Sequence, residues 1–184
     1  MREIKSICVY CGSQSGINEE YVAEARVLGE AMAKSGIDLI YGGGDRGIMG
    51  AVSSACRDNG GNVIGVIPGF LIGFGGESNF VNEEDRVIVT ESMHERKQFM
   101  FEEADALIAL PGGIGTLEEI IEVMTWAQLD QHKKPIGFLN TKGYWNSLIG
   151  LIEHMTEEGF MHNIERVQPI FIEKAEQAIA ALSA

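Results

Sequence analysis

The sequence contains little cysteine and no long hydrophobic run. Its three cysteines among 184 residues are too few, and odd in number, for a disulfide framework, which fits a reducing compartment. No apolar run reaches the roughly 20 residues of a membrane span, and the first residues, MREIKSICVYCG, lack a hydrophobic region followed by a small-residue cleavage site. These absences predict a cytoplasmic protein without a membrane partner.

Basic residues are also scarce. The chain has 14 Lys and Arg against 27 Asp and Glu, a formal net charge of −13. The summed field of such a chain repels long polyanions, so nucleic acid is not expected as a partner. A small anion stays compatible with this charge if local cations and backbone N–H groups receive it.

Two of the cysteines, Cys8 and Cys11, form the pattern C-x-x-C, which also occurs in metal and redox sites. Here the stretch SICVYC reads as a buried strand, and residues three apart on a strand point to opposite faces. A metal or redox role is therefore disfavoured, and no metal or cofactor is expected.

What the sequence does contain is a regular alternation of short apolar runs and helical patterns. The apolar runs lie at 4–10, 37–41, 62–68, 85–90, 105–111, 134–140 and 167–173. The expected helices run from a cap at Asn18 to a stop at Gly36, and over 48–58, 92–103, 116–131, 144–157 and 174–182. This rhythm predicts an α/β fold of the Rossmann-like, doubly wound type: a mostly parallel sheet of about seven strands, with helices on both faces, in one domain over 1–184.

Three of the expected strands end in glycine-containing segments: CGSQSG at 11–16, YGGGDRGIMG at 41–50 and PGGIGT at 111–116. In an open α/β sheet, ligands bind where strands end and helices begin, because helix N-termini there present unpaired N–H groups. We therefore expect the functional site at this edge of the sheet.

The second segment matches G-x-G-x-x-G at Gly42, Gly44 and Gly47. A dinucleotide site needs an acidic residue about 20 positions later, at the end of the next strand, but that strand ends in Pro68 and Gly69. The motif also follows the second strand, whereas a dinucleotide motif normally follows the first. The pattern therefore favours tight helix–strand packing, or the approach of a smaller phosphate ligand, over NAD or FAD binding.

The third segment has two compatible interpretations. Gly112, Gly113 and Gly115 can let the backbone curl around an oxyanion, and Thr116 can add a hydroxyl donor. The stretch from Thr116 to Glu119 also fits the capping box S/T-x-x-E, in which the carboxylate of Glu119 bonds back to the backbone of Thr116. A P-loop is excluded, because no lysine follows the glycines in the required position.

Arg96 and Lys97 lie in the helical pattern just upstream, in ESMHERKQFMFEEAD. They can form an ordinary solvated face. In so acidic a chain they are also the most credible anion clamp, since an arginine can hold a phosphate with two parallel hydrogen bonds.

Four segments together resemble the LOG family, the cytokinin riboside 5′-monophosphate phosphoribohydrolases, whose older name is lysine decarboxylases. They are SMHERK at 92–97, PGGIGTLEE at 111–119, CGS at 11–13 and GGG at 42–44. The resemblance covers nearly the whole chain. It implies a Rossmann-like homodimer that binds a nucleoside 5′-monophosphate, AMP or a cytokinin riboside 5′-monophosphate, and hydrolyses its N-glycosidic bond to free base and ribose 5-phosphate.

By this resemblance, Arg96 and Glu119 match the family's catalytic pair. The substrate-binding positions that it implies are Ser13, Gly43, Glu77, Lys97, Gly112, Gly113, Gly115, Thr116, Glu118 and Thr125. Glu77 lies in the irregular segment 69–86, where the chain departs most from the plant members, so the preferred base is not fixed. A carboxylate at Glu119 can stabilise oxocarbenium charge and orient the attacking water. Arg96 and the backbone of 112–116 can hold the unreactive 5′-phosphate, or Arg96 can instead position the sugar.

Two other functions compete with hydrolysis. Pyridoxal chemistry needs a Schiff-base lysine with supporting groups, and no lysine here stands among such partners, so lysine decarboxylation is disfavoured. A non-catalytic nucleotide or molybdenum-cofactor carrier of the same fold is the stronger alternative, although a carrier would not need both Arg96 and Glu119.

The predicted helix over 116–131 is apolar on more sides than one buried face requires. The residues responsible are Ile120, Ile121, Val123, Met124 and Trp126. This breadth predicts that the helix lies partly at a homodimer interface.

Overall fold

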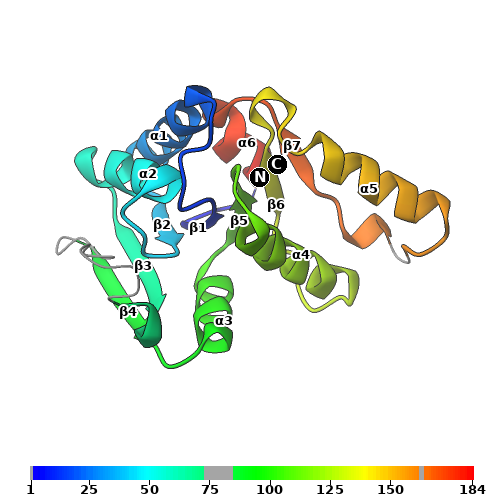
Figure 1. The fold of residues 1–184 in the computed structure, drawn as a ribbon, viewed down its shortest axis with the longest axis horizontal. Coiled ribbons are helices and arrows are strands. Elements are labelled where there is room, and N and C mark those ends of the chain that lie inside the picture. The colour runs from blue at the N-terminus through cyan, green and yellow to red at the C-terminus, as the bar shows by residue number, and fades with distance from the viewer. Residues whose placement is uncertain (1, 73–84, 162–163) are drawn as a thin grey trace.

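The computed structural model describes residues 2–72, 85–161 and 164–184. Its strands are β1 (Ser6–Tyr10), β2 (Asp38–Tyr41), β3 (Val63–Pro68), β4 (Arg86–Thr90), β5 (Ala106–Ala109), β6 (Ile136–Leu139) and β7 (Ile170–Ile172). They form one sheet in the order β4-β3-β2-β1-β5-β6-β7, and every neighbouring pair is parallel (Figure 1). The predicted fold class is confirmed.

In the described residues, six α-helices connect and flank these strands. They are α1 (Glu19–Lys34), α2 (Gly47–Asp58), α3 (Met93–Glu103), α4 (Ile114–Gln128), α5 (Asn146–Glu157) and α6 (Ala178–Ser183). Short 3-10 turns lie at η1 (Gly69–Leu71), η2 (Thr141–Gly143), η3 (Ile164–Arg166) and η4 (Ala175–Gln177). The helix predicted over 174–182 is thus a 3-10 turn followed by a shorter α-helix. Within the described parts of the chain, no helix combines the length and the apolar character needed to cross a membrane.

Both faces of the sheet are buried, and β1 shows how the sequence achieves this. Ile7 and Val9 belong to the apolar cluster beneath α1, α2 and α6, whereas Cys8 and Tyr10 belong to the cluster beneath α3, α4 and α5. Cys11 returns to the first cluster, so Cys8 and Cys11 face opposite sides, as their spacing predicts. Burial raises the pKa of both thiols.

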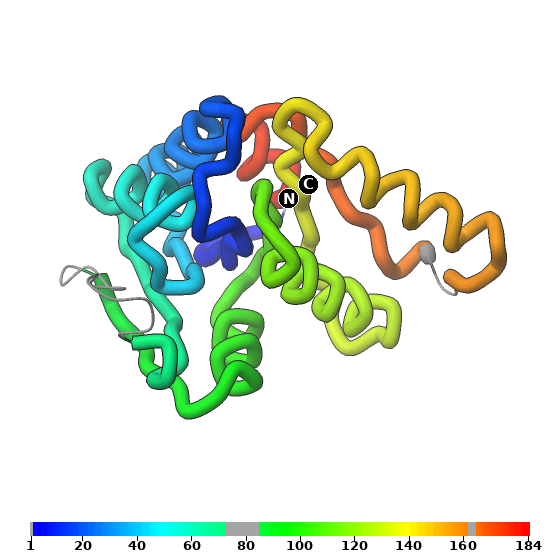
Figure 2. Tube along the Cα trace, viewed as in Figure 1, coloured from blue at the N-terminus to red at the C-terminus, as the bar shows by residue number. Residues whose placement is uncertain are grey.

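The order of the strands places a switch point between β1 and β5. From β1 the chain builds β2, β3 and β4 on one side, then crosses back to β5 on the other side of β1, as the tube in Figure 2 shows. Ligands of open α/β sheets bind outside the carboxyl ends of the strands at such a point. In this chain, the two loops at that point are joined directly by the Gly12 N–H, which donates to the Pro111 carbonyl at 3.1 Å.

The three glycine-containing segments pack backbone against backbone at this edge. Gly47 has φ +58°, and a Cβ on it would lie 2.5 Å from the carbonyl carbon and oxygen of Ser13. A Cβ on Gly12 would lie 3.1 Å from the Cα of Gly112. The loops after β1, β2 and β5 can therefore come this close only without side chains at the points of contact.

We predict that Gly47→Ala destabilises the protein more than Gly60→Ala. Gly60 also has a left-handed φ of +77°, but a Cβ there would meet nothing within 4 Å. In both variants an alanine must adopt a left-handed φ, which is strained for a residue with a Cβ. Only Gly47→Ala also pushes a methyl group into the loop after β1. The extra loss should be about 1–3 kcal/mol in the free energy of unfolding, measured with urea. Equal losses would show that the loop contact is unimportant.

Candidate functional site

Arg96 lies on the second turn of α3 and points inward over the carboxyl ends of β2 and β3. The helix is capped by Ser92, whose hydroxyl oxygen accepts a hydrogen bond from the Glu95 N–H at 3.2 Å. From there the Arg96 Nε donates to the Val66 carbonyl of β3 at 3.0 Å. A buried guanidinium needs fixed acceptors, and this carbonyl is the first of them.

Glu119 on α4 supplies the second acceptor. The Arg96 Nη1 donates to the Glu119 Oε1 at 2.5 Å, and the two side chains are only 7% and 8% exposed. No described residue donates a hydrogen bond to the other carboxylate oxygen, Oε2. The two residues that sequence reasoning selected as a pair are thus in direct contact, with one oxygen left for a ligand.

This contact tests the capping-box interpretation of the third glycine segment. Helix α4 begins at Ile114 with Gly113 as its N-cap, so Thr116 lies inside the first turn. The Glu119 carboxylate bonds to Arg96 rather than to the Thr116 backbone. The predicted capping box is therefore wrong, because an ion pair with a buried guanidinium replaces the local backbone contact.

The first turn of α4 has the properties of an anion site. Its first intrahelical bond runs from the Leu117 N–H to the Gly113 carbonyl at 3.0 Å, so the N–H groups of the preceding helical residues have no partner within the helix. Gly113 and Gly115 are exposed, and a Cβ on either would meet nothing within 4 Å. The positive end of the helix dipole adds to the attraction for a negative group.

A small cavity of about 250 Å³ lies beside this turn at the switch point. Ser13, from the loop after β1, lines it together with Gly112 and Gly113. Tyr144 lines it from the β6 side, and its hydroxyl donates to the Gly112 carbonyl. Its ring also meets that of Tyr21 edge to face, with centroids 5.4 Å apart.

Lys97 and Glu118 meet on the outer side of the α3–α4 pair. The Lys97 Nζ lies 2.6 Å from the Glu118 Oε1 and 3.0 Å from the Glu122 Oε2. Burial lowers the pKa of Lys97, but its hydrogen bonds with the two carboxylates outweigh this and leave the pKa above its usual value. Lys97 is therefore a charged, paired group beside the site.

The other predicted substrate-binding residues lie in different surroundings. Gly43 is buried, and a Cβ there would contact Val66 and Ile67 of β3. Thr125 is exposed nine residues beyond Thr116, about 13 Å along the axis of α4, and its hydroxyl bonds to the Ile121 carbonyl at 2.8 Å. Glu77 lies outside the described residues. The structure thus gathers Arg96, Glu119 and the residues of the α4 first turn, and leaves Thr125 away from them.

The charge state of Glu119 is set by two opposing effects. Burial raises its pKa above the usual value, and the adjacent Arg96 guanidinium opposes this rise. A carboxylate with a raised pKa is a better proton acceptor near neutral pH than an ordinary surface glutamate. The pair therefore combines a fixed cation with a carboxylate suited to activating water.

The family model described as "possible lysine decarboxylase" matches residues 49–182 of the chain. A cytokinin riboside 5′-monophosphate phosphoribohydrolase of Arabidopsis thaliana is 48% identical over 162 residues, which are 88% of this chain and 73% of the relative. One of Oryza sativa subsp. japonica is 49% identical over 157 residues, 85% of this chain and 64% of the relative. The chain belongs to the LOG family.

Solved structures agree with the fold. The molybdenum cofactor carrier protein of Chlamydomonas reinhardtii superposes with a TM-score of 0.69 at 23% identity, covering 97% of this chain and 96% of that one. The molybdenum cofactor binding protein of Rippkaea orientalis gives 0.68 at 23% identity, with 98% and 96% covered. At such identities, the likeness of this LOG-family chain to these proteins concerns its fold alone.

Sequence reasoning missed a residue that positions the pair. A Cβ on Gly42, directly after β2, would lie 2.4 Å from the Arg96 Nη2, so a side chain there would displace the guanidinium. Gly42 lies in the GGG run, but the sequence motif led to its neighbour Gly43 instead. Gly42 was missed because its contact with Arg96 joins residues 54 positions apart in the chain. Tyr144 was missed as well, and no sequence motif marks it.

We predict that Arg96→Met lowers the free energy of unfolding by about 3–5 kcal/mol near pH 7, because it leaves the Glu119 carboxylate buried without its partner. Without the guanidinium, the opposing effect of Arg96 is lost, and burial raises the pKa of Glu119 in the folded state further. The protonated form is then favoured by folding, so the deficit should be largest above this raised pKa and shrink as pH falls towards 4.5. Urea unfolding at several pH values measures this.

The double variant Arg96→Met/Glu119→Leu is the control for this experiment. It removes both charges and should regain much of the lost stability. A deficit of Arg96→Met that is the same at pH 5 and pH 8 would contradict the assignment of the loss to an unpaired carboxylate.

Proposed function

We propose that the chain hydrolyses the N-glycosidic bond of a nucleoside 5′-monophosphate, AMP or a cytokinin riboside 5′-monophosphate, to free base and ribose 5-phosphate. The names of its curated relatives support this activity. The observation that carries it in the structure is the buried pair of Arg96 and Glu119 directly behind the open first turn of α4.

The spacing along α4 suits such a substrate. The first turn receives the 5′-phosphate at the N–H groups of Gly115 and Thr116. Glu119 follows Thr116 by three residues, about 4.5 Å along the helix axis, which is the scale of the step from a 5′-phosphate to the sugar ring. The phosphate does not react, so its binding holds the ribose beside the carboxylate.

The chemistry follows from the environment of the carboxylate. Cleavage of the bond to the base develops positive charge on the ribose, which the Glu119 carboxylate stabilises. Its free oxygen, Oε2, orients a water for attack on C1′ and accepts a proton from it. The C1′–N bond breaks as the new C1′–O bond forms, its electron pair leaves with the base, and the base takes up one proton as it is released. Arg96 fixes the other oxygen and so keeps the carboxylate ionised and aimed, while burial keeps bulk water away.

The structure offers less support for lysine decarboxylation. A Schiff-base lysine needs a lowered pKa so that its amine is neutral. Lys97, the lysine nearest the pair along α3, has a raised pKa because of its hydrogen bonds with Glu118 and Glu122. It is a charged partner of these two carboxylates instead.

We expect the purified protein to release free base from AMP or from isopentenyladenosine 5′-monophosphate. Chromatography of the reaction mixture measures the released base. Glu119→Gln keeps the shape of the side chain but removes the proton acceptor, and should lower the rate about 10²–10⁴-fold. Glu157→Gln, an exposed change on α5, is the matched control and should leave the rate unchanged. A nucleoside without the 5′-phosphate should be a much poorer substrate.

Two outcomes would overturn this function. Release of no base from any nucleoside monophosphate above the Glu119→Gln background, together with tight nucleotide binding, would favour a carrier. Equal turnover of adenosine and AMP would remove the role assigned to the α4 first turn as a phosphate site.

The proposed enzyme is a homodimer that uses the outer face of α3 and α4. Ile120, Val123 and Met124 are buried within the chain, whereas Ile121 and Trp126 stay half-buried and Leu129, at the end of α4, is 63% exposed. A hollow of about 450 Å³ lies between the two helices beside Trp126, and a second copy can fill it. Thr125 lies on this same face.

Light scattering at micromolar concentration should give about twice the 20.1 kDa mass of the chain. Leu129→Glu places a charge on the proposed interface and should shift the mass towards one chain. Leu151→Glu makes the same change on α5, where Leu151 is 52% exposed, and should leave the dimer intact. A monomeric parent protein would rule the dimer out.

The cytoplasmic location, and the absence of nucleic-acid and membrane partners, stay predictions from charge and cysteine content.

A further inference from the structure

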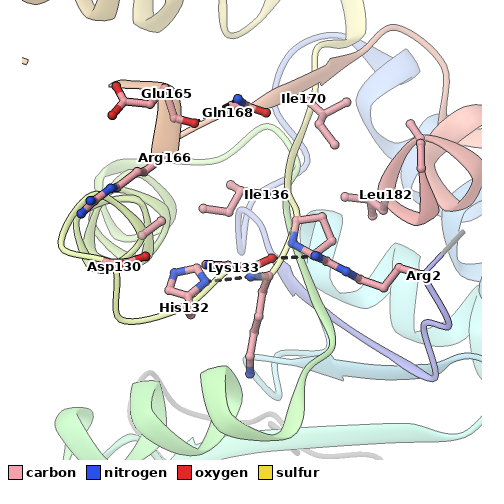
Figure 3. A pocket seen from close by; sticks show the side chains of 15 residues that line it. Arg2, Asp130, His132, Lys133, Ile136, Glu165, Arg166, Gln168, Ile170 and Leu182 are labelled. Carbon is pink, nitrogen blue, oxygen red and sulfur yellow. Dashed lines mark hydrogen bonds between the residues drawn. The ribbon is translucent and has the colours of Figure 1, made fainter. Parts of the chain in front are cut away.

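The amino-terminal edge of the sheet, opposite the proposed catalytic edge, holds a second pocket. Its volume is about 580 Å³, within the range that small ligands occupy. Arg2, the segment 132–136 that leads into β6, and Leu182 of α6 form one part of its wall, and residues 165–170 before β7 form the other (Figure 3). The two ends of the chain meet here, since the Arg2 N–H donates to the Ser183 carbonyl at 2.8 Å.

The distribution of the positive charges singles this pocket out. Eight of the 14 basic residues form ion pairs with carboxylates in the described parts of the chain. Six others form none there: Arg2, Arg26, Arg86, Lys133, Lys134 and Arg166. Four of these six line this one pocket. The chain has nearly twice as many acidic as basic residues, yet most of its basic residues without an ion pair in the described parts line this one pocket.

Three of the four cations are free to meet a ligand. Lys134 points away and donates to the Phe101 carbonyl at 2.5 Å and the Glu102 carbonyl at 3.3 Å, at the end of α3. Arg2 is held beside Lys133 by one bond, from its Nη1 to the Lys133 carbonyl at 2.7 Å, which leaves other guanidinium N–H groups for an acceptor. Lys133 and Arg166 are exposed.

Carboxylates also line the pocket without neutralising these cations. Asp130, Glu165 and the terminal carboxylate of Ala184 belong to its wall. None of the three lies within ion-pair distance of Arg2, Lys133 or Arg166 among the described contacts. The cations therefore remain able to attract an anion from solution. Carboxylates elsewhere on the acidic chain repel that anion only over a range of about 8 Å, because physiological salt screens their charge.

We propose that this pocket binds a small phosphate dianion, free or as a monoester, at Arg2 and Lys133. The planar fork of an arginine can donate two parallel hydrogen bonds to two oxygens of a phosphate, and a lysine supplies a compact second charge. The large negative net charge excludes a nucleic acid, whose many phosphates would face repulsion beyond the pocket. This site is independent of the proposed catalytic function, since it shares no residue with the α4 first turn.

Amide NMR spectra recorded during a titration with inorganic phosphate at constant ionic strength test the proposal. The resonances of Lys133, Gln168 and Leu182 report on this pocket, and those of Gly113 and Gly115 report on the α4 first turn. The first group should shift saturably with its own dissociation constant. A parallel titration with ribose 5-phosphate shows whether a sugar ester binds more tightly than the free ion.

The double variant Arg2→Gln/Lys133→Gln should weaken binding at this pocket about tenfold or more, because each charged hydrogen bond contributes strongly. Arg26→Gln/Arg86→Gln removes the same charge from two unpaired cations elsewhere and should leave that affinity unchanged. Shifts at Lys133 and Gln168 that do not saturate, or that weaken equally in both double variants, would overturn the site. Shifts at Gly113 and Gly115 test the catalytic edge separately.

Discussion

The burial of one positive and one negative side chain against each other is the constraint on which the catalytic edge depends. Arg96 and Glu119 come from different helices, and neither charge is stable inside the protein without the other. Their pairing fixes the position of α3 relative to α4 and requires the Val66 carbonyl as a further acceptor. Position 42 must also lack a side chain, because a Cβ there would collide with the Arg96 guanidinium. A charged contact thus joins α3 and α4 over the carboxyl ends of β2 and β3.

The sequence was sufficient to predict the sheet because its signal is local. Short apolar runs separated by helical patterns define parallel strands buried on both faces, and the seven runs match the seven strands. The start of α4 was mispredicted for the same reason. The pattern from Thr116 to Glu119 is a local capping signal, and it carries no information about a guanidinium 23 residues earlier in the chain that takes the carboxylate away.

The candidate site was predictable only in part, and the missing parts are contacts between distant segments. Arg96 and Glu119 were found through motifs, but the role of Gly42 depends on where the Arg96 side chain ends, which no spacing rule gives. The same holds for Tyr144, whose hydroxyl reaches the Gly112 carbonyl from beyond β6. The pocket at the opposite edge is the extreme case, since residues 2, 133 and 166 come together only in the folded chain.

The glycines at the catalytic edge differ in how freely they can change during evolution. Gly12, Gly47 and Gly112 are enclosed by backbone or by the Thr116 side chain, so any replacement there acts on the scaffold. At Gly113 and Gly115 the same methyl group would enter open space in front of the helix. Substitutions at these two positions alter the volume left for a ligand while the fold stays as it is. New substrate preferences in this scaffold can therefore arise from two codons separated by one other, those of Gly113 and Gly115, without any rearrangement of the core.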